Sequence, residues 1–350
     1  MKNNVILAVI AVIVVSFILV LYFTRSTTKK LSGLEIAKLS VNFFDKMKRD
    51  DGTYDYSMNC TDDSGCVKTQ ENYVQSGAWP VLAYAGLYGA TSEQQYLQKM
   101  NSEASDLLNS CNGNDDECMW ILTQVIRAYK ISGNVEYLNF VKKLGDRLLT
   151  DNNNTDAMMT GMEAREFALL YEMTNDQKYL NEARVRLERS KAAWNVAVDE
   201  FNQPVYSSGS FTLYRFACLT ELGEMEIARV SNDNQALANV INFFNQANIE
   251  SNYINLQQLT AIQPCVETLL ILHDQTGDVK YYDQAKSAMQ YIITYRWDSP
   301  LQIATKYNGD GAYLFDPYMG ENLKTTTDTG YMIYLLSRMP KEQFEVLSWR

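Results

Sequence analysis

The sequence predicts an all-α protein, an (α/α)6 toroid of six inner and six outer helices preceded by one N-terminal transmembrane helix. Three features of its 350 residues lead to this expectation: a long apolar segment at the start, helix-length stretches separated by short polar breaks, and a phrase that recurs at nearly constant spacing. We therefore divide the chain into a membrane anchor with a short linker at 1–30 and a toroid domain at 31–350.

The first element is an apolar run at 5–23, in which Ser16 is the only polar residue. A helix of this length is long enough to cross about 30 Å of hydrocarbon. A cleaved signal peptide is the alternative, but the run is longer than such a peptide needs and no small-x-small cleavage pattern follows it. We expect an uncleaved signal anchor, and hence a single-pass membrane protein.

Four of the six cysteines enclose two short acidic loops: Cys60, Cys66, Cys111 and Cys118. Zinc-binding cysteine pairs usually have about two to four residues between them and are often completed by histidine. Here the gaps are wider and the chain has a single histidine, so we expect two disulfides, no metal site and no cofactor. The remaining pair, Cys218 and Cys265, is left open between a third bridge and buried free thiols.

Two features give opposite orientations of the domain. The basic residues that follow the apolar run, Arg25, Lys29 and Lys30, favour a cytoplasmic domain. Disulfides persist only in an oxidising compartment, and glycosylation sequons beginning at Asn59 and Asn153 also favour the outside. We expect the soluble domain to be extracytoplasmic.

A repeated phrase indicates helical hairpins. It reads "LYGATSEQQYL", "AYKISGNVEYL", "LYEMTNDQKYL" and "LHDQTGDVKYY", and its tyrosines are Tyr96, Tyr137, Tyr179 and Tyr281. In this phrase a glycine or asparagine ends one helix in the left-handed conformation, and the tyrosine opens the next helix as part of its buried first turn. The last interval is long enough for two further units.

We expect twelve helices, in which amphipathic outer helices alternate with inner helices that are apolar almost all round. Pro80 and Pro264 are expected in the first turns of their helices. The expected helices lie near 32–48, 78–89, 93–109, 118–132, 135–149, 157–173, 177–195, 208–229, 233–247, 263–275, 279–296 and 326–337. The order starts with an outer helix and ends with an inner one, so the helices can close as a ring.

With this repeat, the sequence resembles the six-hairpin glycosidase superfamily of toroids, which includes glycoside hydrolases, polysaccharide lyases and sugar epimerases. The resemblance covers 31–340 and rests on the repeat spacing and the "TGD-x-x-Y" phrase, without a motif specific for one family. Prenyltransferase-like and lanthionine-synthetase-like toroids share these features. An open solenoid is the alternative fold, although its period would be nearer about 34 residues.

The resemblance implies a cavity at the N-terminal ends of the inner helices. Two long loops, 49–77 and 297–325, precede the first and last inner helices and should meet over this cavity. Both contain Asp-Gly followed by aromatic residues, and sugar sites combine aromatic faces with carboxylates that act as acid and base. We expect a groove with Asp51 and Asp310 on opposite sides, Glu163 at its floor, and Tyr54 and Tyr313 as its walls.

Candidate site residues follow from this groove. The rim carboxylates also include Asp316, Glu321 and Asp328, and Glu166 lies beside Glu163 in the sequence. Candidates for catalysis, among which the sequence does not choose, are Asp51, Asp310 and Glu163. Candidates for substrate binding are Tyr54, Trp79, Arg165, Tyr313 and Asp50. Arg165 has the geometry to bind a uronic acid carboxylate, or it balances its acidic neighbours.

Charge and motifs exclude several function classes. Without the anchor the chain has 30 basic and 42 acidic residues, a net charge of −12, which disfavours nucleic acid as a partner. Phosphate-binding loops, nucleophile elbows and histidine-based metal motifs are absent from the sequence. We expect a membrane-anchored, carbohydrate-binding toroid that hydrolyses surface or extracellular glycans. The alternative is a non-catalytic toroid that binds glycans or serves as a scaffold at the cell surface.

Overall fold

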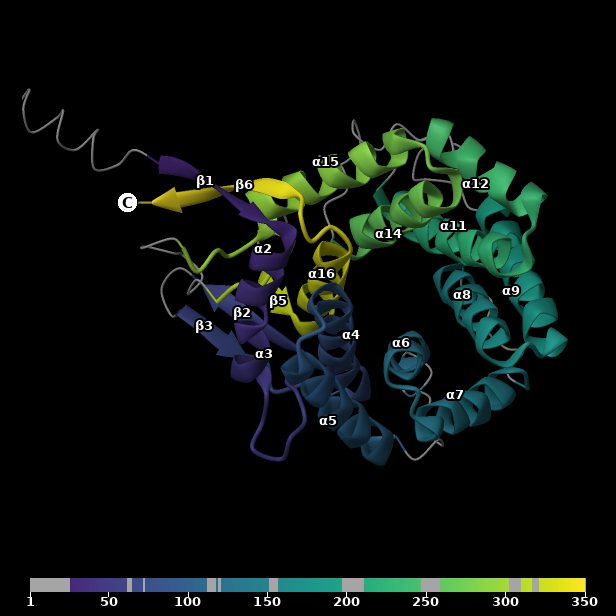
Figure 1. Ribbon diagram of the computed structural model, residues 1–350, viewed down its shortest axis with the longest axis horizontal. Helices are drawn as coiled ribbons and strands as arrows, with labels where there is room; N and C mark the ends of the chain where they lie inside the picture. The colour runs from purple at the N-terminus through teal and green to yellow at the C-terminus, as the bar shows by residue number, and fades with distance from the viewer. Residues whose placement is uncertain are drawn as a thin grey trace, which may run out of the picture.

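The computed structural model describes residues 26–61, 65–71, 73–111, 118, 121–150, 157–196, 211–246, 259–301, 310–316 and 321–349. A ring of helices forms its centre: α4 (Val74–Thr91), α6 (Leu122–Ser132), α8 (Ala157–Thr174), α11 (Phe211–Ser231), α14 (Leu259–Thr276) and α16 (Thr326–Arg338). Each packs against the next, and α16 packs against both α14 and α4 (Figure 1). The ring is therefore closed, as expected.

A second layer of helices surrounds this ring, and each outer helix packs against an inner partner (Figure 1). The outer helices are α2 (Gly33–Ser40), α3 (Asn42–Met47), α5 (Gln94–Ser110), α7 (Val135–Leu148), α9 (Gln177–Val196), α12 (Asn234–Gln246) and α15 (Val279–Arg296). All twelve expected helices are present, and the first of them is divided into α2 and α3. The all-α toroid is confirmed.

The repeated phrase has the predicted conformation. Gly133 and Gly277 follow their helices with φ of 67° and 69°, and Asn175 has φ of 54°. The tyrosines that open the next helices are buried, for example Tyr137 and Tyr281, each 2% exposed. Local backbone requirements therefore place the hairpin turns.

The starts of two inner helices differ from the expectation. Both α4 and α14 begin four residues before the predicted starts, so that Pro80 and Pro264 lie inside them. Proline removes the hydrogen bond to the residue four positions before it and its ring crowds that residue's carbonyl, and the packing of these helices against neighbours on both sides offsets this cost in their first two turns.

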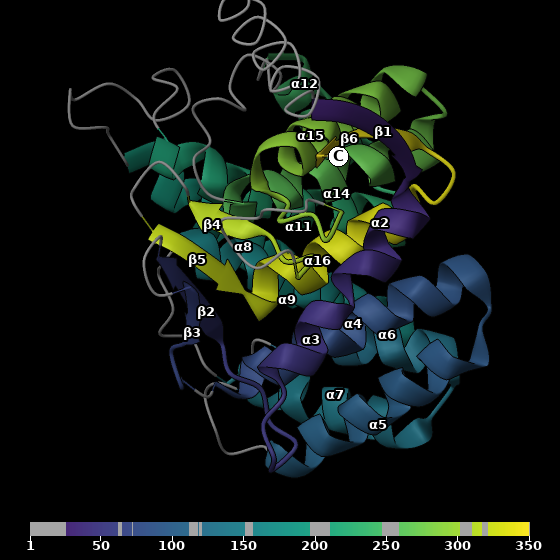
Figure 2. The same cartoon turned by 90° about the vertical axis from the view of Figure 1, so that its left-hand side faces the viewer.

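A small sheet that the sequence did not predict lies at one side of the ring, next to α16 (Figure 2). Its strands are β2 (Ser57–Thr61), β3 (Gly65–Lys68), β4 (Leu314–Asp316) and β5 (Glu321–Thr325), in the antiparallel order β3-β2-β5-β4. Met58 pairs with Lys324 in this sheet. The two long loops therefore meet, as expected, and they do so through backbone pairing.

A second, two-stranded sheet joins the first and last described segments of the chain (Figure 1). It consists of β1 (Ser26–Ser32) and β6 (Gln343–Trp349), and β6 packs on α15. Across the described part of the chain, no helix combines the length and apolar character needed to cross a membrane. The expected anchor at 5–23 lies outside the described residues and stays a prediction.

All six cysteines form disulfides. Cys60 and Cys66 lie opposite each other on β2 and β3 and are bridged, and the second pair joins Cys111 to Cys118. The pair that the sequence left open, Cys218 and Cys265, is also bridged and joins α11 to α14. Both predicted disulfides are therefore present, and a third ties two inner helices together.

Candidate functional site

A cavity of ≈ 250 Å³ lies at the centre of the ring, and all six inner helices line it. Their lining residues include Gln75, Trp79, Thr123, Gln124, Met162, Arg165, Glu166, Leu219, Gln263, Thr327 and Tyr331. Most of these residues lie in the first half of their helices, as Thr123 and Thr327 do at the second positions of α6 and α16. The cavity is therefore at the N-terminal ends of the inner helices, as the toroid resemblance implied.

One wall of the cavity is aromatic. The rings of Trp79 on α4 and Tyr331 on α16 lie with their centroids 5.7 Å apart and a tilt of 32°. Within the described residues, the indole N–H of Trp79 has no hydrogen-bond partner. An aromatic face with a polar edge is the usual material for binding a sugar ring.

Glu166 supplies a carboxyl group to the same cavity. It is only 4% exposed, and its side chain makes no hydrogen bond within the described part of the chain. Burial, reinforced by the nearby charge of Glu163, raises the pKa of Glu166 well above its usual value, although Arg165 opposes the shift. Burial therefore favours the protonated form of Glu166.

Arg165 precedes this acid in the sequence, and an ion pair with Glu267 fixes its guanidinium. Its Nη2 lies 2.7 Å from each carboxylate oxygen of Glu267 on α14. Arg127 contacts the same carboxylate at 3.2 Å, and the hydroxyl of Tyr331 donates a hydrogen bond to it. Burial favours the neutral form of Glu267, but the two guanidinium groups outweigh it and lower the pKa, so this group is a carboxylate.

The sequence matches no protein-family model and no curated protein. Solved structures are similar over most of the chain. An unsaturated glucuronyl hydrolase specific for heparin shares 11% identity at a TM-score of 0.63, covering 88% of this chain and 96% of that one. A family 76 glycoside hydrolase from a bovine Bacteroides thetaiotaomicron strain shares 14% identity at a TM-score of 0.60, covering 88% and 77%.

A third similar structure is an α-1,6-mannanase of Salegentibacter in complex with α-1,6-mannotriose. It shares 12% identity at a TM-score of 0.61, covering 88% of this chain and 99% of that one. The protein in that structure is an inactive variant in which two adjacent aspartates are replaced by asparagine. This chain folds as a six-hairpin glycosidase-like toroid. At such low identities the likeness shows the fold, and the chemistry has to come from the site.

Two of the predicted substrate-binding residues, Trp79 and Arg165, line the central cavity of the toroid. The predicted groove, however, does not form. Glu163 lies 2.8 Å from Nη1 of the buried Arg186, between α8 and the outer helix α9. A buried carboxylate needs such a partner, and on α8 the neighbouring Glu166 takes the position in the cavity lining.

Asp310 and Tyr313 are also away from the cavity. Asp310 is buried beneath the small sheet, where its Oδ1 lies 2.9 Å from Nζ of Lys324 and accepts a hydrogen bond from the backbone of Ala312. The side chain of Tyr313 is fully buried. These contacts lie within the loop 297–325, and burial keeps both residues from acting as a groove side and a wall.

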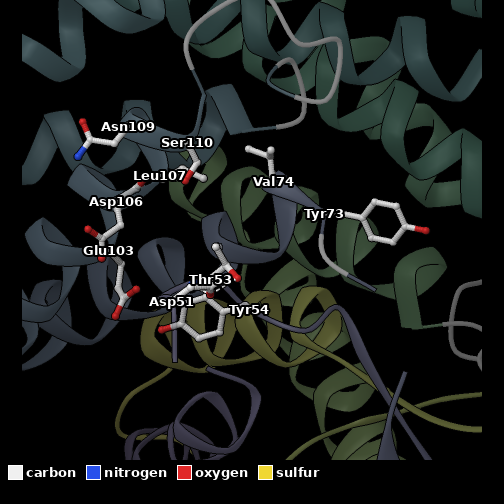
Figure 3. A pocket seen from close by; sticks show the side chains of 12 residues that line it. Asp51, Thr53, Tyr54, Tyr73, Val74, Glu103, Asp106, Leu107, Asn109 and Ser110 are labelled. Atoms are coloured by element: carbon white, nitrogen blue, oxygen red, sulfur yellow. Dashed lines mark hydrogen bonds between the residues drawn. The ribbon is translucent and has the colours of Figure 1, made fainter. Parts of the chain in front are cut away.

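Asp51 and Tyr54 line a separate pocket of ≈ 290 Å³ at the surface. Asp51 accepts hydrogen bonds from the N–H and hydroxyl of Thr53, as turn aspartates do. Figure 3 shows Glu103, Asp106 and Asn109 of α5 on the other side of this pocket. Asp50 is exposed and does not line it. The described residues hold no group of three potential metal ligands, here or elsewhere.

Sequence reasoning missed Glu267, Gln263 and Tyr331. Glu267 had a recognisable signal, because it is a single charge within the otherwise apolar stretch "PCVETLLIL" of an inner helix. A charge in such a position has to be paired inside the protein. The sequence does not identify its partners, since Arg127 and Arg165 lie 140 and 102 residues away in the chain.

Proposed function

We propose that this protein is a membrane-anchored glycoside hydrolase whose active site is the central cavity of the toroid. The observation that carries the proposal is the position of Glu166, a buried acid without a hydrogen-bond partner among the described residues, in the same cavity lining as the Trp79–Tyr331 wall. The similar solved structures that are named as glycoside hydrolases support it. Glycans at the surface or outside the cell are the proposed substrates, and residues 5–23 the proposed anchor.

Glu166 acts as the general acid in this proposal. Cleavage of a glycosidic bond needs a protonated carboxyl group to donate to the leaving oxygen, together with a second carboxylate on the other side of the sugar. A raised pKa suits the first role because it favours the protonated form, which can donate its proton. The Trp79–Tyr331 wall lines the same cavity and offers aromatic faces to the sugar ring.

The second carboxylate is assigned to the adjacent pair Asp115 and Asp116. These residues lie outside the described part of the chain, but in the sequence they stand shortly before α6, which begins at Leu122 and whose first residues line the cavity. Two adjacent aspartates are the residues replaced in the inactive mannanase variant. Of the other adjacent pairs, Asp50–Asp51 belongs to the surface turn and Asp62–Asp63 to the β2–β3 connection.

Turnover of a polysaccharide panel by the detergent-solubilised chain tests the proposal. Glu166→Gln, and the double change Asp115→Asn with Asp116→Asn, should each lower turnover by roughly a hundredfold or more while glycan binding persists. Matched controls are Asp62→Asn with Asp63→Asn, a second adjacent pair, and Glu163→Gln, one turn away on α8. Both should keep turnover if the proteins stay folded. Glycan binding by the native chain without any turnover would instead select the non-catalytic toroid.

Extraction of native membranes with alkaline carbonate tests the anchor. The full chain should stay in the membrane fraction, and a chain without residues 1–24 should be released. Protection of the domain from protease added outside intact cells would contradict the extracytoplasmic orientation.

A further inference from the structure

We infer that the central cavity binds a sugar carrying a single negative charge, a uronate carboxylate or a sulfate ester, and that Arg165 is the residue that recognises it. The inference rests on the proposed function and names its substrate class. It depends on three observations: the unused nitrogens of Arg165, the way this side chain is held, and the charge around the cavity.

The guanidinium of Arg165 is only partly used within the protein. Its Nη2 makes both contacts to Glu267, whereas Nε and Nη1 have no partner within the described residues. The side chain is 12% exposed, and the residue lines the cavity. A buried guanidinium with unused donors gains from an anionic oxygen more than from a hydroxyl, since charge-assisted hydrogen bonds are about twice as strong as neutral ones.

The position of this guanidinium is set before any ligand arrives. Glu267 holds Nη2 through both oxygens, and the hydroxyl of Tyr331 holds Glu267 in turn. Tyr331 also belongs to the aromatic wall. The anion-binding group and the ring-binding wall are therefore parts of one connected assembly, and little side-chain entropy is lost on binding.

The carboxylate partner of Arg165 is shared. Ion pairs connect Arg165 with three other cations, Arg127, Arg229 and Lys130, through three carboxylates, those of Glu267, Glu226 and Glu172. Arg165 therefore has no carboxylate to itself among these groups. Burial raises the pKa of Glu166, the described acid in the cavity lining, and so favours its neutral form over a second carboxylate for Arg165.

A shared carboxylate partner favours an anionic ligand. A neutral sugar would offer the unused nitrogens of Arg165 only neutral acceptors, whereas an anionic oxygen would form charge-assisted hydrogen bonds with them. A uronate or a sulfate ester supplies such an oxygen on a sugar. The net charge of −11 for the whole chain repels anions at long range, so the attraction has to come from this local contact.

Titration calorimetry of the detergent-solubilised full chain with matched sugars tests the inference. The probes are methyl glycosides of glucuronate, galacturonate and mannuronate, the methyl ester of each, the parent neutral hexosides, and their 6-sulfates. We expect at least one charged member to bind about tenfold or more tightly than its own ester and hexoside, which have nearly the same shape. Comparing the affinities of the uronates with those of the 6-sulfates decides which of the two anionic groups the cavity prefers.

Variants locate the preference. Arg165→Gln should abolish the preference for the charged sugar and leave binding of the neutral hexoside within about twofold. Arg127→Gln is the matched control, because Arg127 contacts the same carboxylate of Glu267 without lining the cavity, and it should keep the preference. Equal binding of charged and neutral sugars by the unmodified chain overturns the inference and leaves the proposed function standing. Binding of none of the probes, together with no polysaccharide turnover, contradicts both.

Discussion

Arg165 and Glu267 contact each other across the interior of the ring, although α11 lies between their helices, α8 and α14, around its circumference. Nη2 of Arg165 lies 2.7 Å from both carboxylate oxygens. The contact links two inner helices that are not neighbours and forms part of the cavity wall. The same ion pair therefore contributes to the stability of the ring and to the character of its site.

Removing the charge of Glu267 should destabilise the toroid strongly. In Glu267→Gln, two buried guanidinium groups lose their shared carboxylate, and breaking a buried pair in this way costs about 3–5 kcal/mol. The control is Asp274→Asn, which removes the largely exposed partner of Arg338 and should cost no more than about 1 kcal/mol. Urea unfolding monitored by circular dichroism measures both. A similar cost for the two variants would show that the central pair is not a major contributor.

Stability should fall as the pH rises from 4.5 toward 8 because of Glu221. Burial, with a smaller contribution from Glu224, raises the pKa of Glu221 from 4.5 to about 8. Between these values the folded protein keeps a proton that the unfolded chain has released. The free energy of unfolding therefore decreases with pH, by at most about 1.4 kcal/mol per pH unit from this group. Glu221→Gln should flatten the decrease in urea unfolding measured from pH 5 to 8, and an unchanged slope would contradict the assignment.

Glu172 should cause a pH dependence of the opposite sign at acidic pH: the free energy of unfolding should rise with pH there. Burial acts to raise the pKa of this group, but the hydrogen bonds from Arg229 and Lys130 outweigh it and lower the pKa to about 2. The unfolded chain binds a proton near its ordinary value of 4.5, so this contribution to stability is lost as the pH falls from 4.5 to 2. Glu172→Gln should weaken the dependence of stability on pH in that window only. A change confined to neutral pH would be inconsistent with this cause.

The three disulfides should differ in their effect on stability. The Cys218–Cys265 bridge spans a sequence separation of 47 residues and the Cys60–Cys66 bridge one of 6. On the loop-entropy model these bridges contribute about 4 and about 2 kcal/mol. Changing both cysteines of a pair to alanine should therefore lower the thermal midpoint more for Cys218–Cys265. Peptide mapping without reduction of the native protein checks the pairing, and alkylatable free thiols would show that the bridges do not form in the cell.

Closure of the ring depends on close contact between α4 and α16 at Gly330. A Cβ at this position would lie 2.7 Å from the backbone oxygen of Trp79, so Gly330→Ala forces the two helices apart. We expect a cost of roughly 1–3 kcal/mol and a weaker affinity for sugars, because the Trp79–Tyr331 wall lies at this contact. Gly89→Ala is the control, since a Cβ there meets nothing within 4 Å and should stabilise α4 by about 0.5–1 kcal/mol.

The sequence alone determined the helices, the hairpin turns and two of the disulfides. These features depend on interactions over a few residues: the left-handed turn at Gly133 or Gly277, the buried tyrosine four residues later, and cysteines a short distance apart. It also determined that the ring could close, because alternating amphipathic and largely apolar helices have few ways to bury their apolar faces. Local propensity and periodicity are readable without the fold.

Only the tertiary structure decided how the strands of the small sheet pair, and which carboxylates are ion-paired and which line the cavity. Met58 and Lys324 pair across more than half of the chain, and neither strand has a stable form without the other. Glu163 and Glu166 stand three residues apart with similar sequence surroundings, yet one meets Arg186 and the other lines the cavity. The energy of a buried charge depends on the partner that arrives from a distant helix, and that partner is a property of packing rather than of local sequence.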